Sequence, residues 1–172
     1  MARILVIGIG NVLLCDEGAG VHAVRRLAAQ ASVPRPDVRF VDGGTLSFTL
    51  APAIEACDRL IVFDAARVGG PAGTVECFVD GEMDRFLGRS RRSVHEVGLL
   101  DLIDIARLTG SVPPQRALIG IEPERIEWAD TPSESVSAGI ERAIAIGSRL
   151  LSEWPTAPSS SGATAMQAPA NA

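Results

Sequence analysis

The chain has 172 residues, of which 47% are hydrophobic and 22% are charged, and its net charge is −5. This length suits one domain with a single sizeable core, and the acidic balance gives no electrostatic support to a nucleic-acid partner. No uninterrupted apolar run approaches the length of a membrane span, and the N-terminus is typical of a strand and not of a signal peptide. We therefore expect a cytoplasmic protein that binds neither nucleic acid nor membrane.

Cysteine usage agrees with a reducing compartment. Cys15, Cys57 and Cys77 are odd in number and far apart in the sequence. They match neither a disulfide framework nor the spacing of a zinc motif. We expect three reduced thiols.

Apolar runs alternate with helical patterns along the chain. Residues 3–8 lack polar alternation, which is typical of a parallel strand covered on both faces. Further strands are expected at 38–42, 59–65, 73–79 and 116–122. Helices are expected at 18–30, 46–57 and 96–108, with a short helical piece at 83–87 and a basic loop at 88–93.

The last helix has the clearest start signal. Thr131 offers a hydroxyl at the expected N-cap, Pro132 follows at the first helical position, and Glu134 lies three residues after the cap. The pattern predicts one three-layer α/β/α domain over residues 1–154, built around a twisted, mostly parallel sheet. Residues 155–172 carry no charge and are rich in Pro, Ser and Ala, so we expect a disordered tail.

Acidic residues close several of the expected strands. Asp42, Asp64 and Glu122 each follow an apolar run, and the glycine-rich loop Gly8–Gly20 closes another. Ligands of open α/β sheets bind at the carboxyl ends of parallel strands. If these strands are parallel, the loop and the acids share one rim of the sheet.

The glycine-rich loop resembles a dinucleotide fingerprint only in part. Gly8 and Gly10 fit the pattern, but Leu13 occupies the third glycine position, and Asp16 and Glu17 would repel a pyrophosphate. A simpler interpretation makes Asp16 the cap of the helix that begins near Gly18. That interpretation explains Glu17 less well, because one cap is enough.

A second possibility is a cation site. His95 precedes a helix, where a lone histidine is most simply a hydrogen-bonded structural residue, and His22 fits a surface position on an amphipathic helix. Taken together, Glu17, Asp64 and His95 would supply two carboxylates and one imidazole. Such ligands suit divalent nickel, zinc or iron with coordination positions left open.

Several stretches resemble one known family in order and spacing: ILVIGIGNVLLCDEGAGVHAVRRL, DGGT at 42–45, LIVFDA at 60–65, SVHEVGLLDLI at 93–103 and IGIEPERIEW at 119–128. Over residues 3–151 the chain is similar to the endopeptidases that mature nickel–iron hydrogenases. The resemblance implies a three-layer α/β fold and removal of a C-terminal extension from the hydrogenase large-subunit precursor after nickel insertion. It also implies that Glu17, Asp64 and His95 bind the metal, and that Asp42 is functionally important.

The resemblance leaves the chemistry open. The nickel would be carried by the substrate, and other divalent metals would be able to substitute for it. The metal could activate water, or Asp42 or Asp16 could act as a general base. The sequence contains neither a Ser-His-Asp signature nor a His-Glu-x-x-His motif. A non-hydrolytic nickel sensor or delivery module stays as the alternative.

Two positions depart from the family pattern. Ser47 replaces a glycine that usually follows the DGGT unit, and Cys15 replaces a small residue or threonine. Cys15 could add a soft metal ligand. A nucleophilic role with His95 as its base is disfavoured, because the neighbouring acids oppose a thiolate. The arginines of the 88–93 loop could contact the precursor, although a solvated loop is the simpler expectation.

Overall fold

The structure, a computed structural model, contains one five-stranded sheet with the strand order β2-β1-β3-β5-β4. It describes residues 3–31, 35–46, 48–89 and 94–154, with the side chains of 94–97 outside this description. Strands β2, β1, β3 and β5 are parallel, and β4 is an antiparallel edge. The mostly parallel sheet is therefore confirmed. The strands are β1 (Ile4–Ile9), β2 (Val38–Gly44), β3 (Arg59–Ala65), β4 (Val75–Val79) and β5 (Gln115–Ile121).

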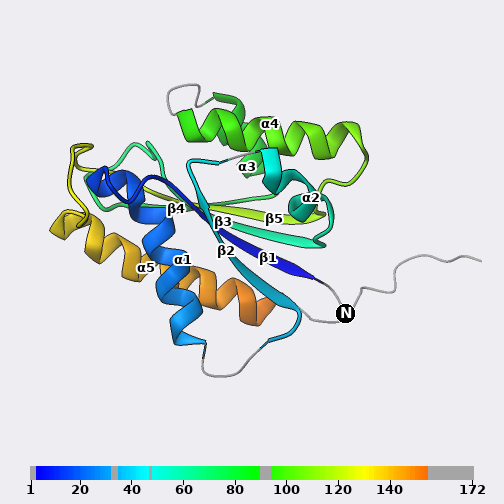
Figure 1. Ribbon diagram of the computed structural model, residues 1–172, viewed down its shortest axis with the longest axis horizontal. Coiled ribbons are helices and arrows are strands. Elements are labelled where there is room, and N and C mark those ends of the chain that lie inside the picture. The colour runs from blue at the N-terminus through cyan, green and yellow to red at the C-terminus, as the bar shows by residue number, and fades with distance from the viewer. Residues whose placement is uncertain (1–2, 32–34, 47, 90–93, 155–172) are drawn as a thin grey trace, which may run out of the picture.

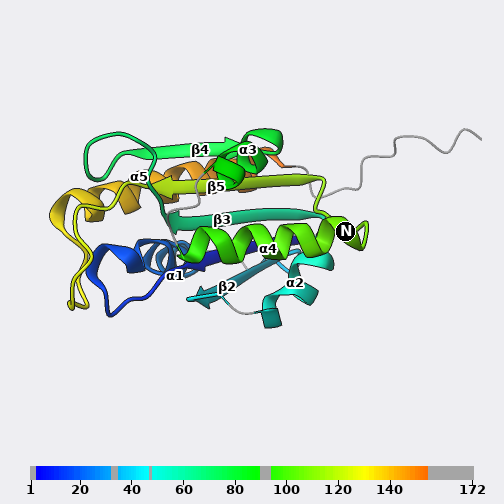
Figure 2. The same cartoon turned by 90° about the horizontal axis from the view of Figure 1, so that it is seen from above.

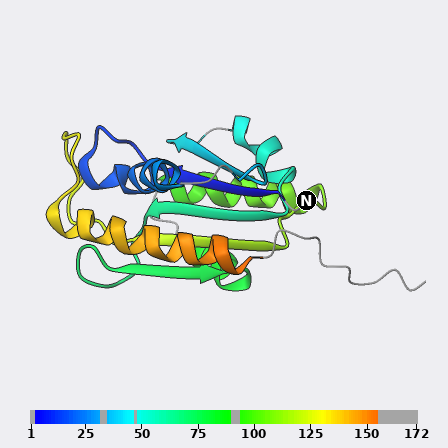
Figure 3. The same cartoon turned by 90° about the horizontal axis from the view of Figure 1, so that it is seen from below.

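Helices cover both faces of the sheet, as the sequence predicts for a three-layer domain (Figure 1). Figure 2 shows one face covered by α2, α3 and α4, and Figure 3 shows α1 and α5 on the other. The helices are α1 (Ala19–Gln30), α2 (Ala51–Glu55), α3 (Gly81–Arg89), α4 (Val94–Leu108) and α5 (Glu134–Glu153), with short 3-10 helices η1 (Cys15–Gly18) and η2 (Phe48–Leu50).

Strand alternation divides the core into two halves. Along β1, Ile4 and Val6 pack under α1 and α5, whereas Leu5 and Ile7 pack under α2, α3 and α4. All six residues of β1 are buried. A strand covered on both faces gains from apolar side chains at every position, which explains the unbroken apolar run.

The expected elements mostly coincide with the observed ones, with local differences. The helix expected at 46–57 is shortened to η2 and α2, with Pro52 in the first turn of α2. The short helix expected at 83–87 extends over all of α3 and takes in the start of the expected basic loop. The rest of that loop, residues 90–93, and the tail 155–172 lie outside the described residues.

The cap of α5 lies two residues later than expected. Ser133, and not Thr131, is the N-cap, because its hydroxyl accepts a hydrogen bond from the Val136 amide at 3.4 Å. Pro132 therefore precedes the cap instead of opening the helix. The Ser133 hydroxyl also donates a hydrogen bond to a buried carboxylate near the candidate site, described below.

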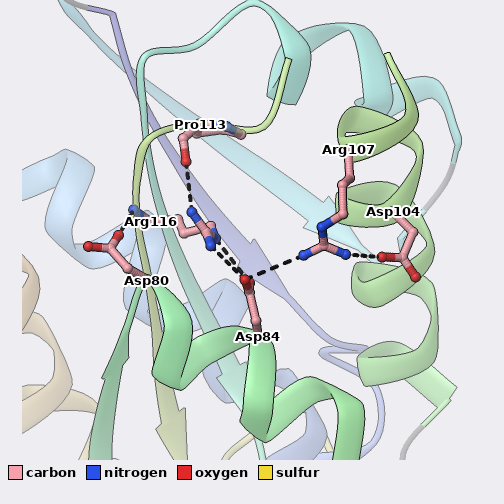
Figure 4. A network of polar contacts seen from close by, with 6 residues as sticks. All are labelled: Asp80, Asp84, Asp104, Arg107, Pro113 and Arg116. Carbon is pink, nitrogen blue, oxygen red and sulfur yellow. Dashed lines mark hydrogen bonds and ion pairs between the residues drawn. The ribbon is translucent and has the colours of Figure 1, made fainter. Parts of the chain in front are cut away.

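A polar network joins α3 and α4 to the amino end of β5 (Figure 4). Asp84 accepts hydrogen bonds from Arg116 at 2.6 and 3.0 Å and lies 3.4 Å from Arg107. The Arg107 guanidinium also pairs with Asp104 in the preceding turn of α4. The hydrogen bonds that Arg116 donates to Asp84 raise the pKa of Arg116 above its ordinary value. The network fixes the short helix α3 against its neighbours.

We expect the close approach of α1 to the sheet to demand glycine at position 20. A Cβ atom there would lie 2.2 Å from the Phe63 carbonyl oxygen and 2.4 Å from that of Ile9. Gly20→Ala should lower the free energy of unfolding by about 2–4 kcal/mol, since the backbone of two strands would have to shift.

Gly88→Ala is the matched control, because position 88 is also helical but has no atom within 4 Å of the added Cβ. Urea denaturation should show Gly88→Ala unchanged or stabilised by up to about 1 kcal/mol. Equal effects of the two substitutions would contradict the close-packing argument.

Candidate active site

Gly10 shapes the loop that carries the first candidate ligand. Its φ is +134°, and a Cβ atom on it would lie 1.8 Å from the carbonyl oxygen of Glu17. Only glycine allows the end of β1 to pass this close to η1. The contact holds Glu17 at the carboxyl end of the sheet, half-buried, with its Oε2 atom shielded from solvent.

Asp64 lies at the same end of the sheet. It belongs to the last part of β3, which packs against η1, and its side chain is 1% exposed with Oδ2 shielded from solvent. Leu60 and Val62 of the same strand pack under α2, α3 and α4, so alternation directs Asp64 to that face. Two carboxylates with shielded oxygens thus occupy the rim, as the strand-end argument predicts.

His95 falls in the first turn of α4, and its side chain lies outside the described residues. Figure 2 shows α4 beginning at the carboxyl end of the parallel strands, in the layer that Asp64 faces. Within the described part of the chain, no group of three His, Cys, Asp or Glu side chains is arranged to hold a metal ion. The trio of Glu17, Asp64 and His95 therefore stays a prediction.

Asp42 lies on the opposite face of the sheet. Its Oδ2 accepts hydrogen bonds from Arg25 of α1 at 2.6 and 3.1 Å, and its Oδ1 accepts one from the Gly44 amide at 3.0 Å. Strand β1 separates it from β3, so two strand spacings of about 4.8 Å place it roughly 10 Å from Asp64. The two acids share the rim but cannot share one ion.

Asp42 borders an open cavity of about 330 Å³. Gly10, Asn11 and Thr45 also line this cavity, together with Arg25. The carboxylate is exposed, so solvent and an extended chain can both reach it. Arg25 is a functional neighbour that the sequence pattern did not reveal, because its contact depends on the packing of α1 over β2.

Asp16 is fully buried, and its hydrogen bonds give it a structural role. Its Oδ2 accepts hydrogen bonds from the Glu124 and Arg125 amides and the Ser133 hydroxyl, and its Oδ1 accepts one from the Ser133 amide, all at 2.7–3.0 Å. Burial raises the pKa of this carboxyl, but the hydrogen bonds from Arg125, Ser133 and Glu124 outweigh it and hold the pKa below 3.8. The geometry therefore does not support Asp16 as a general base.

Asp16 does not cap α1 either. The N-cap of that helix is Gly18, which has no side-chain cap, and the carboxylate points instead to the segment before α5. Sequence reasoning missed this partner, which lies more than a hundred residues away. The local signal is a hydroxyl residue before α5, and both Thr131 and Ser133 offer one.

Cys15 is part of the same buried junction. Its thiol is fully buried and donates to the Thr131 carbonyl oxygen at 3.3 Å, and its backbone has a left-handed φ of 54°. This inward position supports neither the soft-ligand role nor the nucleophilic role considered from the sequence.

Glu122 and His22, also considered from the sequence, are both at least partly buried. Glu122 is buried and accepts hydrogen bonds from Arg67 and the Gly69 amide, so it fixes the crossing between β3 and β4. His22 is half-buried, not superficial as expected, and its Nε2 is shielded from solvent. Burial and the nearby Arg26 and Arg25 lower the pKa of His22, which favours neutral imidazole.

Comparison with known proteins identifies the family. The family model described as hydrogenase maturation protease matches residues 21–149. The chain belongs to this family. It is 40% identical over 153 residues to the hydrogenase expression/formation protein HupD of Rhodobacter capsulatus, covering 88% of this chain and 72% of the relative. It is 36% identical over 144 residues to the hydrogenase 2 maturation protease of Escherichia coli, covering 83% and 86%.

Solved structures agree with this assignment. The hydrogenase maturating endopeptidase HybD from E. coli has a TM-score of 0.81 and 33% identity, with 87% of this chain and 93% of that chain covered. This chain is therefore a peptidase, as the resemblance of its sequence implies. None of the described helices is long and apolar enough to cross a membrane.

We expect Asp16→Asn to destabilise the maturation protease. The amide group would face backbone N–H donors, so the free energy of unfolding should fall by about 2–4 kcal/mol at neutral pH. The wild-type contribution is present above pH 3.8 and is lost as the pH falls through the lowered pKa of Asp16. As the pH is lowered, the free energy of unfolding of Asp16→Asn should therefore fall less than that of the wild type.

Asp130→Asn is the control for this measurement, because Asp130 is exposed and lies in the same segment. Its free energy of unfolding should stay within about 0.5 kcal/mol of the wild type. Equal stability of the two variants in urea would show that Asp16 has no special structural role.

Proposed function

We propose that this protein removes the C-terminal extension of a nickel–iron hydrogenase large-subunit precursor in the cytoplasm, and that it recognises the precursor through nickel already inserted there. The observation that carries the proposal is the placement of Glu17 and Asp64 at the carboxyl end of the sheet, each with an oxygen shielded from solvent. Membership of the hydrogenase maturation protease family supplies the reaction class and the kind of substrate.

The nickel is a feature of the substrate in this proposal. Glu17, Asp64 and His95 would bind it at coordination positions that the precursor leaves open, and another divalent metal could take its place. Carboxylate and imidazole ligands suit such ions. Binding that depends on the metal separates a loaded precursor from an empty one, because an empty precursor offers these acids nothing to coordinate.

We assign the general base to Asp42 in preference to Asp16. Asp42 is exposed and borders a cavity, whereas Asp16 is fully buried. Asp42 would accept a proton from water as the oxygen adds to the scissile carbonyl, and the proton would then pass to the leaving amine. Arg25 holds Oδ2 and the Gly44 amide holds Oδ1, so the orientation of the carboxylate is fixed.

The roughly 10 Å between Asp42 and Asp64 gives the two acids separate tasks. Metal recognition would occur on the α4 face of the rim and bond cleavage on the α1 face. A precursor held by its metal would extend its C-terminal segment across the end of β1 to reach Asp42. A sensor or delivery module would need the metal ligands but would not need a solvent-exposed carboxylate beside the cavity that Asp42 borders.

Intact-mass spectrometry tests the function directly. A cognate large-subunit precursor, with or without nickel loading, is incubated with the protease. We expect loss of a C-terminal peptide from the loaded precursor alone. Cleavage of both forms would contradict nickel recognition, and cleavage of neither would favour the sensor or delivery alternative.

Substitution of the proposed metal ligands should weaken recognition. Glu17→Gln and Asp64→Asn should each lower the rate at sub-saturating loaded precursor by about tenfold or more, since each removes a charged ligand. Glu76→Gln is the control, because Glu76 is an exposed acid on β4. Equal rates for all three variants and the wild type would remove Glu17 and Asp64 from the recognition site.

Substitution of Asp42 should separate binding from cleavage. Asp42→Asn should lower kcat by about a hundredfold or more, because general base catalysis contributes that much. Its affinity for loaded precursor should equal that of the wild type. Single-turnover cleavage with a parallel binding measurement checks both, and an unchanged cleavage rate would exclude Asp42 as the base.

A further inference from the structure

Three large apolar side chains are exposed on two neighbouring loops. Trp128 is 81% exposed, Ile126 is 55% exposed and Leu13 is 54% exposed. Exposed tryptophan is costly in water, and clustered apolar side chains on a soluble protein mark interaction sites. We refer to these three residues as the apolar loop patch.

Backbone hydrogen bonds join the two loops that carry the patch. The Cys15 amide donates to the Ala129 carbonyl oxygen at 2.7 Å, and the Ala129 amide donates to the Leu13 carbonyl oxygen at 3.1 Å. Leu14 and Ala129 form an isolated parallel bridge. These contacts place Leu13 beside the segment that contains Trp128.

Buried Asp16 holds this pair of loops to the domain. Its carboxylate binds the Glu124 and Arg125 amides, which precede Ile126, and binds Ser133, which follows Trp128. The backbone on both sides of the patch is therefore fixed while its side chains stay in water. A rigid surface of this kind loses little conformational entropy when a partner binds.

The patch lies at the same end of the molecule as the candidate metal ligands. Helix η1, which contains Glu17, follows directly after Leu14. Figures 1, 2 and 3 agree that the loop before η1 and the loop before α5 lie side by side beyond the carboxyl end of the sheet. A protein bound at Glu17 would therefore have the patch within its footprint.

The acidic residues near the patch indicate the charge of the partner that it would bind. Exposed acids flank Ile126 and Trp128 in the sequence. The neighbouring basic residue Arg125 lies 3.3 Å from Glu127 and is paired with it. The exposed acids are Glu124, Glu127, Asp130 and Glu134. A second copy of this chain would bring the same acids together across a two-fold axis, which like-charge repulsion opposes. The complementary partner has an apolar centre and a basic rim.

We infer that the apolar loop patch is the docking surface for the folded body of the precursor, and that Trp128 is its central anchor against an apolar, basic-rimmed area of that protein. This inference rests on the proposed function for the identity of the partner. It assigns recognition to two parts of the protease: the metal ligands test whether nickel is present, and the patch binds the surrounding protein.

The test compares Trp128→Ala with Leu108→Ala in the full chain. Leu108 is 88% exposed at the end of α4, so it is an equally accessible apolar control remote from the rim. For cleavage of loaded precursor, Trp128→Ala should raise KM about tenfold or more and leave kcat within about twofold. Leu108→Ala should change neither, and Trp128→Phe should restore most of the affinity.

Binding of precursor to immobilised protease, measured without reference to cleavage, separates this inference from the proposed function. If the wild type binds and Trp128→Ala binds about tenfold more weakly, the result supports the docking inference even where no cleavage occurs. If the wild type cleaves the precursor and Trp128→Ala has the same KM and affinity, the docking inference is wrong. A self-associating wild type with a monomeric, fully active Trp128→Ala would assign the patch to a second copy and overturn the inference.

Discussion

The buried carboxylate of Asp16 is the interaction on which the rim of this protein depends. It receives hydrogen bonds from Glu124, Arg125 and Ser133 and so joins the loop after β1 to the segment before α5. A buried charge is costly unless it is fully hydrogen-bonded, and here both oxygens are satisfied. One side chain therefore fixes the loop that carries Glu17 and the loop that carries Trp128.

The sheet then divides the rim into two working faces. Alternation along β3 turns Asp64 toward α4, whereas Asp42 on β2 contacts Arg25 of α1. Strand β1 lies between β2 and β3, so the two acids are carried by strands that are not neighbours. In the mechanism proposed above, the metal would be bound on one of these faces and the peptide would reach the carboxylate on the other.

Recognition in this scheme is distributed, which suits an enzyme that acts on a folded protein. Two or three metal ligands contribute a test for nickel but little contact area. The apolar loop patch adds area beside them, and its acidic surroundings favour a basic partner surface and disfavour self-association. Specificity then comes from the combination, since neither the metal alone nor the surface alone would give full affinity.

The sequence by itself determined the layered fold and most of the strands, because the apolar runs of β1, β3 and β5 have no other stable placement than a sheet covered on both faces. It also placed Asp42, Asp64 and the glycine loop at one rim, since parallel strands end together. Only the tertiary structure decided that Asp16 is structural, that Asp42 and Asp64 face opposite sides, and that Ser133 is the cap of α5. Those outcomes depend on contacts between segments up to 117 residues apart, and local pattern carries no information about such distant partners.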